Sequence, residues 1–119
     1  MAHFLGIVSE EDLIGLYKNS ALVVIPTLYE AGSSPLYEAM RYKVPVICSN
    51  VTSLPETIND VEFIFNPLDV NDLANKIKKG LSDSDYRSRN VQNSVNRMVE
   101  LKQIDIVKNF INVYKKLLN

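Results

Sequence analysis

Short apolar runs alternate with longer segments of helical spacing along the first part of the chain. Four of these runs are rich in β-branched or aromatic residues and predict strands: 3–8, 21–26, 45–49 and 62–66. Two of them, ALVVIP and PVICS, are almost continuously apolar, which is typical of strands buried on both faces of a sheet. The alternation of such strands with helices predicts an α/β fold with a mainly parallel sheet of about four strands.

Three capping patterns mark the starts of helices in this part of the chain. In each, a Ser or Asp that can accept from backbone N–H groups is followed three residues later by an acidic residue: Ser9 with Asp12, Ser53 with Glu56 and Asp69 with Asp72. The first and third patterns predict helices over 9–18 and 71–81, and the second predicts a short helix. We interpret these acidic residues as capping groups or solvated surface.

The C-terminal part of the chain has helical spacing and no strand pattern after Pro67. Its apolar residues recur at steps of three and four: Leu101, Ile104, Val107, Ile111, Tyr114 and Leu118. This spacing predicts an amphipathic helical tail, flanked by lysines and packed on the sheet. No internal repeat or low-complexity linker interrupts the 119 residues, so we expect a single domain over 1–119.

Composition narrows the class of protein. The chain is 46% hydrophobic and 23% charged, and 13 Lys and Arg against 14 Asp and Glu give a net charge of -1, so a broad basic surface for nucleic acid is not expected. The single cysteine, Cys48, excludes a disulfide framework and a Cys-rich zinc site within one chain, and its apolar strand predicts a buried thiol. No signal-peptide pattern opens the sequence and no apolar run could span a bilayer, so we expect a cytoplasmic protein.

The most informative stretch is VIPTLYEAGSSPLYEAMRYKVPVICSN, residues 24–50. A strand ends at Pro26, a loop with small residues follows, and Ser34 and Pro35 predict the N-cap and first position of a helix that reaches about Tyr42. Ligands of open α/β sheets bind beyond the carboxyl ends of the strands, where this loop lies. Free N–H groups beside Gly32 at such a helix start are suited to binding phosphate.

Two carboxylates bracket this helix start. Glu30 lies in the loop, and Glu38 follows on the second turn of the helix, where no capping box accounts for it. Carboxylates beside a phosphate repel it, so one interpretation is that both accept hydrogen bonds from neutral hydroxyls of the same ligand, such as ribose or a sugar. The other is that both only decorate a helix start.

The segment YEAGSSPLYEAM, with its Glu-x7-Glu spacing, resembles glycosyltransferase family 4, the retaining GT-B enzymes. The flanks FLGIVSEEDLIGLYKNSALVVIPTLYE, SLPETI and FIFNPLDVNDLANKI are similar to the segments that surround this motif in the family, so the resemblance covers about the first 80 residues. Some members have the bulkier loop Glu-Gly-Phe-Gly-Leu-Pro where this chain has EAGSSP at 30–35, which leaves the identity of the sugar open.

The resemblance implies a three-layer, Rossmann-like fold, that of the C-terminal, donor-binding domain of a GT-B enzyme. It implies transfer of a hexosyl group from a nucleotide-diphosphate sugar, such as a UDP- or GDP-sugar, with retention of anomeric configuration and with no obligatory metal or other cofactor. Glu30 would act as the catalytic residue that contacts the sugar hydroxyls and helps to place the anomeric carbon, and Glu38 would bind the ribose. The remaining donor-binding residues are expected at the same edge of the sheet: Gly32, Ser33, Ser34, Ser49 and Asn50.

The resemblance also implies that this chain is the later part of a donor-binding domain, without the N-terminal acceptor domain of the parent enzyme. We therefore expect the isolated chain to bind donor weakly and to transfer no sugar alone. The parent enzyme would be cytoplasmic or peripheral to the inner face of the membrane. An exposed sheet edge left by the missing strands could support self-association.

Three other classes fit the sequence poorly. A receiver-like domain needs clustered acidic residues at the end of its first strand, whereas the acidic residues after FLGIV occupy capping positions. No G-x-G-x-x-G follows any strand, and no G-x-x-x-x-G-K-[ST] is present, which argues against a dinucleotide oxidoreductase and a nucleotide hydrolase. The strongest alternative is a glycosyltransferase-derived domain that only binds nucleotide or another partner.

Overall fold

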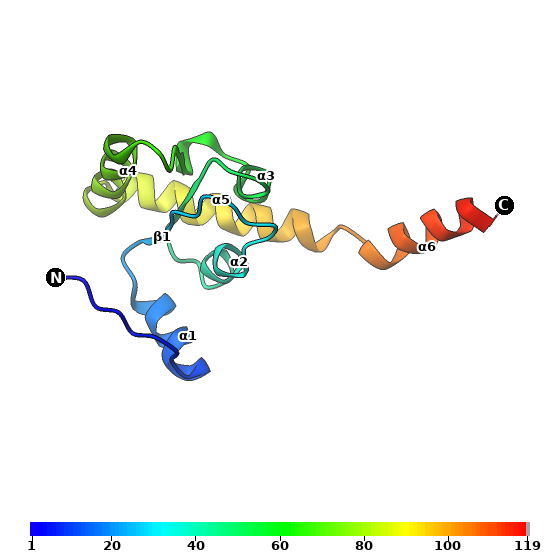
Figure 1. Ribbon diagram of the computed structural model, residues 1–119, viewed down its shortest axis with the longest axis horizontal. Helices are drawn as coiled ribbons and strands as arrows, with labels where there is room; N and C mark the ends of the chain where they lie inside the picture. Colours follow the sequence, from blue (N-terminus) through cyan, green and yellow to red (C-terminus); the bar gives the residue numbers. More distant parts are fainter. Residues whose placement is uncertain (119) are drawn as a thin grey trace.

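A short parallel sheet forms the centre of the computed structural model, which describes residues 1–118 (Figure 1). Its strands are β1 (Val23–Ile25), β2 (Val46–Ser49) and β3 (Ile64–Phe65), in the order β1-β2-β3. The other elements are α1 (Glu10–Asn19), α2 (Ser34–Arg41), α3 (Leu54–Ile58), the 3-10 helix η1 (Val61–Phe63), α4 (Val70–Ser82), α5 (Ser84–Lys102) and α6 (Ile106–Leu118). The predicted α/β class with a parallel sheet is confirmed.

The central strand β2 is buried along its whole length. Its side chains pack among those of the neighbouring helices, and the largest fully buried groups include Leu36 of α2, Leu54 of α3 and Phe63 of η1. The nearly continuous apolar run PVICS therefore becomes a strand covered on both faces, as its composition predicts. Cys48 lies fully buried in this strand, as expected.

The predicted strand over 3–8 is not a strand in the structure. Phe4 and Ile7 are fully exposed, and Gly6 has a φ of +65°, which interrupts an extended conformation. An apolar run becomes a strand only where a sheet edge pairs with its peptide groups, and this segment pairs with none within residues 1–118. The sheet therefore has three described strands instead of about four, with β1 at one edge. Self-association through that edge stays a prediction.

Two of the three predicted capping patterns are confirmed. The hydroxyl of Ser9 accepts from Asp12 N at 3.1 Å and donates to the Asp12 carboxylate at 2.7 Å. The helix α1 begins at Glu10, directly after Ser9. The carboxylate of Asp69 accepts from the backbone N–H groups of Asn71 and Asp72 at the start of α4. Local capping chemistry thus sets both helix starts.

The other two predicted helix starts were wrong in detail. The N-cap of α2 is Ser33, whose hydroxyl accepts from Leu36 N at 3.2 Å, so Ser34 is already helical. Ser53 precedes α3 but makes no capping hydrogen bond. Its hydroxyl donates instead to the carbonyl of Ala31, because the loop that precedes α2 lies beside it in the folded chain.

The helix α5 connects the rest of the domain. It contacts α2, α3 and α4, and in Figure 1 it runs along the domain from α4 past α3. The buried amide of Asn90 accepts from Val46 N at 2.8 Å and donates to Val46 O at 2.7 Å, so it satisfies both peptide groups at the start of β2. Tyr86 packs edge-to-face on Phe63 with ring centroids 5.2 Å apart, and Arg97 donates to the carbonyl of Thr57 in α3.

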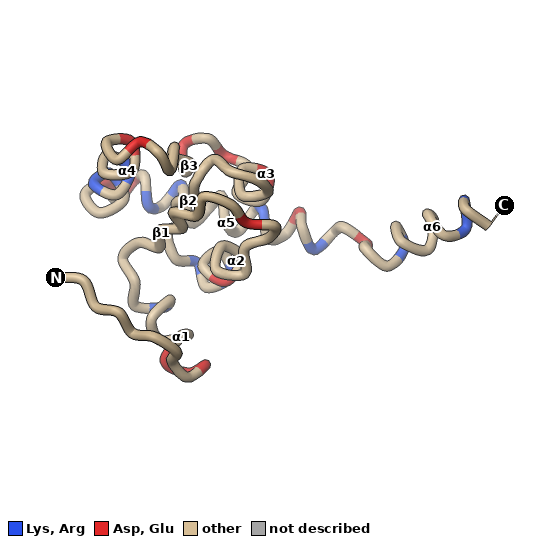
Figure 2. The backbone as a smooth tube through the Cα atoms, viewed as in Figure 1, with Lys and Arg blue, Asp and Glu red and all other residues tan. Residues whose placement is uncertain are grey.

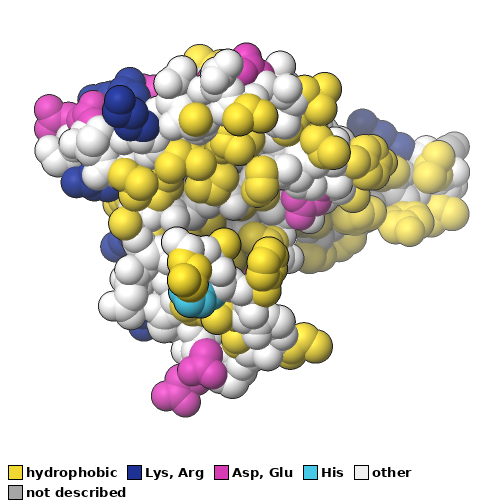
Figure 3. All heavy atoms as spheres, turned by 60° about the vertical axis from the view of Figure 1, so that its left-hand side comes forward, with side chains coloured by type: hydrophobic (Ala, Val, Ile, Leu, Met, Phe, Trp, Pro, Cys, Tyr) yellow, Lys and Arg dark blue, Asp and Glu magenta, His cyan; other side chains and the backbone are white. Residues whose placement is uncertain are grey.

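The C-terminal tail differs from the prediction of one helix packed on the sheet. The helix α5 ends at Lys102, and Asp105 then caps the separate helix α6 by accepting from Lys108 N at 2.8 Å. No side chain of α6 is buried, and the helix projects away from the domain as an arm (Figures 1 and 3). All its charged residues are lysines (Figure 2), and its apolar residues, Phe110 and Leu117 among them, are exposed. None of the helices in residues 1–118 combines the length and apolar character needed to cross a membrane.

Replacing Asn90 with Ala should destabilise the domain strongly. The change leaves a donor and an acceptor of Val46 buried without partners, and each such group costs roughly 1–3 kcal/mol. We expect the free energy of unfolding, measured by urea denaturation, to fall by about 2–4 kcal/mol. The exposed Asn75 on α4 provides the matched control, because Asn75→Ala should change the free energy of unfolding by less than about 0.5 kcal/mol. Equal effects of the two variants would contradict this role of Asn90.

Truncation after Gln103 should leave the stability of the domain nearly unchanged. The removed segment contains α6, whose side chains contribute no burial to the core. We expect the midpoint of urea denaturation to stay within experimental error of the full chain. A clear loss of stability would show that α6 packs on the domain in solution.

Candidate functional site

Two loops meet at the carboxyl edge of the sheet. Residues 26–33 connect β1 to α2, and residues 50–53 connect β2 to α3. Because β1 and β2 are parallel neighbours, with Val23 opposite Val46 and Ile25 opposite Cys48, both loops leave the sheet at the same edge. This edge is where ligands bind in open α/β sheets.

Three hydroxyl groups at the end of β2 and in the loop 50–53, which we call the second loop, hold the loop 26–33, which we call the first loop. Ser49, buried at the end of β2, donates to Thr27 O at 2.6 Å. Thr52 donates to Glu30 O, and Ser53 donates to Ala31 O at 3.2 Å. The backbone around Glu30 is therefore held at two successive carbonyl groups.

The start of α2 leaves several amides free. The Ser33 hydroxyl and carbonyl accept from Leu36 N and Tyr37 N, each at 3.2 Å. Within residues 1–118, the amides of Gly32, Ser33 and Ser34 donate to no protein group. A Cβ added at Gly32 would meet no atom within 4 Å, so the space in front of the loop is open. Free amides at the positive end of a helix favour an anionic ligand.

Glu38 has different neighbours from Glu30. It is half-buried on α2 and lines a cavity of about 150 Å³ between α2 and α1, together with Tyr17, Arg41 and Tyr42. Tyr17 stacks on Tyr42 with ring centroids 5.7 Å apart. Burial, together with the hydrogen bond and the negative charge of Glu38, raises the pKa of Tyr17 to about 12. The Glu38 carboxylate therefore faces the Tyr17 hydroxyl.

Residues 1–97 match the model of the family described as glycosyl transferases group 1. The chain belongs to this family. It is 36% identical over 114 residues to the O-antigen chain mannosyltransferase B of Escherichia coli, covering 96% of this chain and 30% of that protein. It is 41% identical over 83 residues to the serotype-specific mannosyltransferase WbdA of Escherichia coli, covering 70% of this chain and 10% of that protein. Among solved structures, it is similar to the sucrose-phosphate synthase of Thermosynechococcus elongatus, with a TM-score of 0.79, 29% identity, and coverage of 98% of this chain and 30% of that chain.

This glycosyltransferase chain thus spans less than a third of the length of these relatives. The matches confirm the predicted family and the predicted α/β fold class. They do not test the roles of the individual residues, which stay predictions.

The predicted site residues fall into three places in the glycosyltransferase chain. Glu30 and the residues 32–34 share the loop before α2, at the carboxyl edge of the sheet. Glu38 faces α1. Asn50 is exposed and lines a separate pocket of about 340 Å³ with β3 residues such as Phe65, while the hydroxyl of Ser49 is buried and engaged with the first loop.

Sequence reasoning missed the part that Thr52 and Ser53 play at this edge. Both lie in the loop after β2, and the sequence did contain a signal, since small hydroxyl residues follow two adjacent predicted strands. Only the tertiary structure shows that their hydroxyls reach the loop that contains Glu30.

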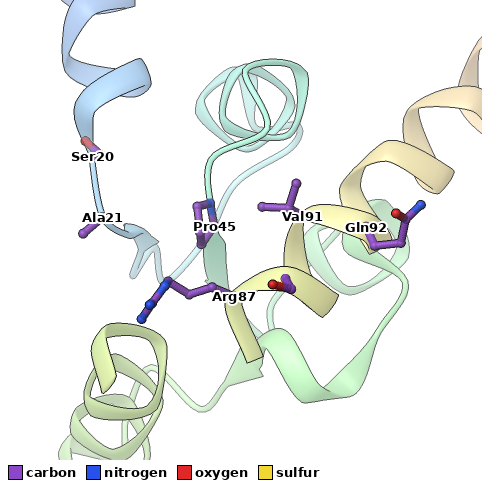
Figure 4. Close-up of a pocket in the computed structure, with 7 residues that line it drawn as sticks. Ser20, Ala21, Pro45, Arg87, Val91 and Gln92 are labelled. Atoms are coloured by element: carbon purple, nitrogen blue, oxygen red, sulfur yellow. The ribbon is translucent and has the colours of Figure 1, made fainter. Parts of the chain in front are cut away.

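Two other features of the glycosyltransferase chain offer no reactive group. Burial raises the pKa of the Cys48 thiol to about 12, so the thiol stays protonated at neutral pH. A pocket of about 530 Å³ lies at the opposite, amino edge of the sheet, beside Ala21 and Pro45 (Figure 4). Its one cation, Arg87, reaches toward α4 and donates to Gly80 O at 3.2 Å and Leu81 O at 2.9 Å.

Replacing Glu38 with Gln should lower the pKa of Tyr17, because Glu38 raises it through both its hydrogen bond and its charge. Burial should keep the pKa above the ordinary value of 10.0. Ultraviolet titration of the tyrosines, with Tyr17→Phe to assign the signal, measures the change. The exposed Glu56 is the matched control, since Glu56→Gln should leave the titration unchanged. An unaltered Tyr17 titration in Glu38→Gln would contradict the contact.

The same shift predicts a loss of stability at alkaline pH. The unfolded chain releases the Tyr17 proton near pH 10, whereas the folded chain holds it to about pH 12. The contribution of Tyr17 to the free energy of unfolding is therefore fully present below pH 10 and is lost as the pH rises to about 12. Glu38→Gln should narrow the pH range over which this stability is lost, because it lowers the pKa of Tyr17 in the folded chain. Urea denaturation at several pH values would measure the free energy of unfolding across this range.

Proposed function

We propose that this chain provides the donor-binding part of a glycosyltransferase that moves a hexosyl group from a nucleotide-diphosphate sugar to an acceptor with retention of configuration. The observation that carries this proposal is the fixed loop 26–33, which holds Glu30 beside the free amides of residues 32–34. One neutral, hydroxyl-rich part and one anionic part of the same ligand would suit this combination.

Glu30 is suited to the sugar. Its side chain is half-buried, and no group within residues 1–118 donates to its carboxylate or forms an ion pair with it. A carboxylate in this state can accept hydrogen bonds from two sugar hydroxyls at once. Such bonds would orient the sugar ring and place its anomeric carbon for transfer.

The amides of Gly32, Ser33 and Ser34 are suited to the diphosphate. They lie at the positive end of α2, and these donors are free to bind phosphate oxygens. In this position they would stabilise the charge that develops on the departing nucleoside diphosphate. This part of the chemistry requires neither a metal nor a side-chain nucleophile.

Glu38 is suited to the ribose. An ionised carboxylate has about four acceptor sites, and Tyr17 uses only part of them. The adjoining cavity of about 150 Å³ leaves room for further donors beside Glu38. Ribose hydroxyls entering from this side would share the carboxylate with Tyr17. Asn50, in its separate pocket after β2, would add a further contact to the donor.

The relatives favour mannose as the sugar. Both of the Escherichia coli relatives described above are mannosyltransferases. We infer a UDP- or GDP-linked hexose as donor and a growing polysaccharide or glycolipid as acceptor. Because this chain spans less than a third of these relatives, the acceptor site would lie in an N-terminal domain outside it. The enzyme would work in the cytoplasm or at the inner face of the membrane.

Replacing Glu30 with Gln should weaken the binding of the sugar but not of the nucleotide. Hydrogen bonds to charged groups are worth about 1.5–3 kcal/mol, so we expect the Kd for the preferred nucleotide sugar to rise roughly tenfold or more while the Kd for the nucleoside diphosphate is nearly unchanged. Isothermal titration calorimetry with GDP-mannose, UDP-glucose, GDP and UDP measures both. In a chain that includes the acceptor domain, the same variant should lose most of its turnover.

The matched control is Glu56→Gln, which replaces an exposed glutamate on α3 and should change the Kd for neither ligand. Equal affinity of wild type and Glu30→Gln for every nucleotide sugar would overturn the role of Glu30. Binding of nucleotide without any preference for a sugar would instead favour a non-catalytic nucleotide-binding domain.

A further inference from the structure

The structure assigns Thr52 and Ser53 as positioning residues for the donor sugar: their hydroxyls hold the peptide groups that follow Glu30 and Ala31 in the orientation that the sugar requires. This inference rests on the proposed function of Glu30 and names the residues that keep it in place. Neither residue would touch the reacting atoms.

The hydroxyl contacts extend the pairing of two strands beyond the sheet. Within the sheet, β1 and β2 pair through their peptide groups as far as Ile25 and Cys48. Past that point, Thr27 accepts from Ser49, Glu30 from Thr52 and Ala31 from Ser53, so the two segments continue side by side in parallel. Side-chain hydroxyls thus take over from backbone N–H donors where the chain leaves the extended conformation.

The backbone conformation of Thr52 is unusual for a β-branched residue. Thr52 has a φ of +50°, in the left-handed region that β-branched residues rarely adopt. A glycine would adopt this conformation with less strain, but it has no hydroxyl to offer to Glu30. A β-branched hydroxyl residue at such a position is therefore informative, because its hydroxyl donates to the Glu30 carbonyl.

Holding two successive carbonyls also fixes the amides of the loop. In a trans peptide the C=O and the following N–H point in opposite directions, and none of the peptide bonds described in residues 1–118 is cis. With the carbonyls of Glu30 and Ala31 directed at Thr52 and Ser53, the N–H groups of Ala31 and Gly32 point away from the second loop. The same two bonds restrict the backbone rotation that would move the Glu30 side chain relative to a bound sugar.

The two hydroxyls contribute little to the core. Thr52 is exposed and Ser53 is half-buried, so loss of either hydroxyl creates no internal cavity, and water can replace it at the carbonyl. Their removal should therefore loosen the loop without unfolding the domain. In an enzyme, a misplacement of about 1 Å can cost about a hundredfold in rate, so a loosened loop would affect transfer as well as binding.

The test compares Thr52→Ala with Thr52→Ser, which share the loss of the methyl branch and differ only in the hydroxyl, and adds Ser53→Ala. Calorimetry measures the Kd for the nucleotide sugar that wild type prefers, from the GDP-mannose and UDP-glucose pair, and for the matching nucleoside diphosphate. We expect Thr52→Ala to raise the Kd for the nucleotide sugar about tenfold, as the loss of one hydrogen bond to the Glu30 carboxylate would, and the Kd for the diphosphate by less than about twofold. Thr52→Ser should match wild type, and the thermal unfolding midpoints of all variants should be similar.

A second measurement keeps this inference separate from the proposed function. Amide ¹⁵N relaxation should show increased motion at Ala31 and Gly32 in Thr52→Ala and Ser53→Ala, but not in Thr52→Ser. Failure of wild type to prefer any nucleotide sugar would overturn the proposed function, while unchanged motion of these amides would overturn the positioning role by itself. The positioning role would also be overturned if Thr52→Ala bound the nucleotide sugar as tightly as wild type does. It would be overturned as well if the Kd for the nucleoside diphosphate and the Kd for the nucleotide sugar rose equally.

Discussion

The parallel pairing of β1 with β2 is the constraint on which the rest of the structure depends. Because β2 is buried along its length, its register against β1 fixes where both strands end and therefore where their loops meet. The hydroxyls of Ser49, Thr52 and Ser53 continue this pairing into the loops. The place of Glu30 is thus a consequence of the register of the sheet.

Stability and the candidate site lie at opposite ends of the central strand. At its start, Asn90 completes the hydrogen bonds of Val46, and nearby Tyr86 packs on Phe63 to hold α5 against the domain. At its end, the buried hydroxyl of Ser49 and the more exposed hydroxyls of Thr52 and Ser53 hold a loop that contributes few buried side chains. This separation is common in α/β folds, where a rigid sheet supports loops that bind ligands. It allows the two roles to be altered independently.

The sequence predicted the elements well where local chemistry decides them. The start of α1 at Ser9 and of α4 at Asp69 followed from capping, and the buried strand β2 followed from its apolar run. The start of α2 was one residue off, because Ser33 and Ser34 are equally good N-caps in isolation and the fold chooses between them. The spacing of Glu30 and Glu38 pointed to the site, but it could not show that Glu38 faces Tyr17.

By itself, the sequence determined the family, the parallel α/β class and the loop that contains Glu30, since these depend on residue order and on short-range capping and periodicity. The tertiary structure decided which apolar segments found a partner. The run at 3–8 has the composition of a strand and α6 has the spacing of a packed helix, yet both are exposed, because burial requires a complementary surface. It also decided that Thr52 and Ser53 hold the Glu30 loop, a contact between residues 22 positions apart that only the pairing of the strands brings together.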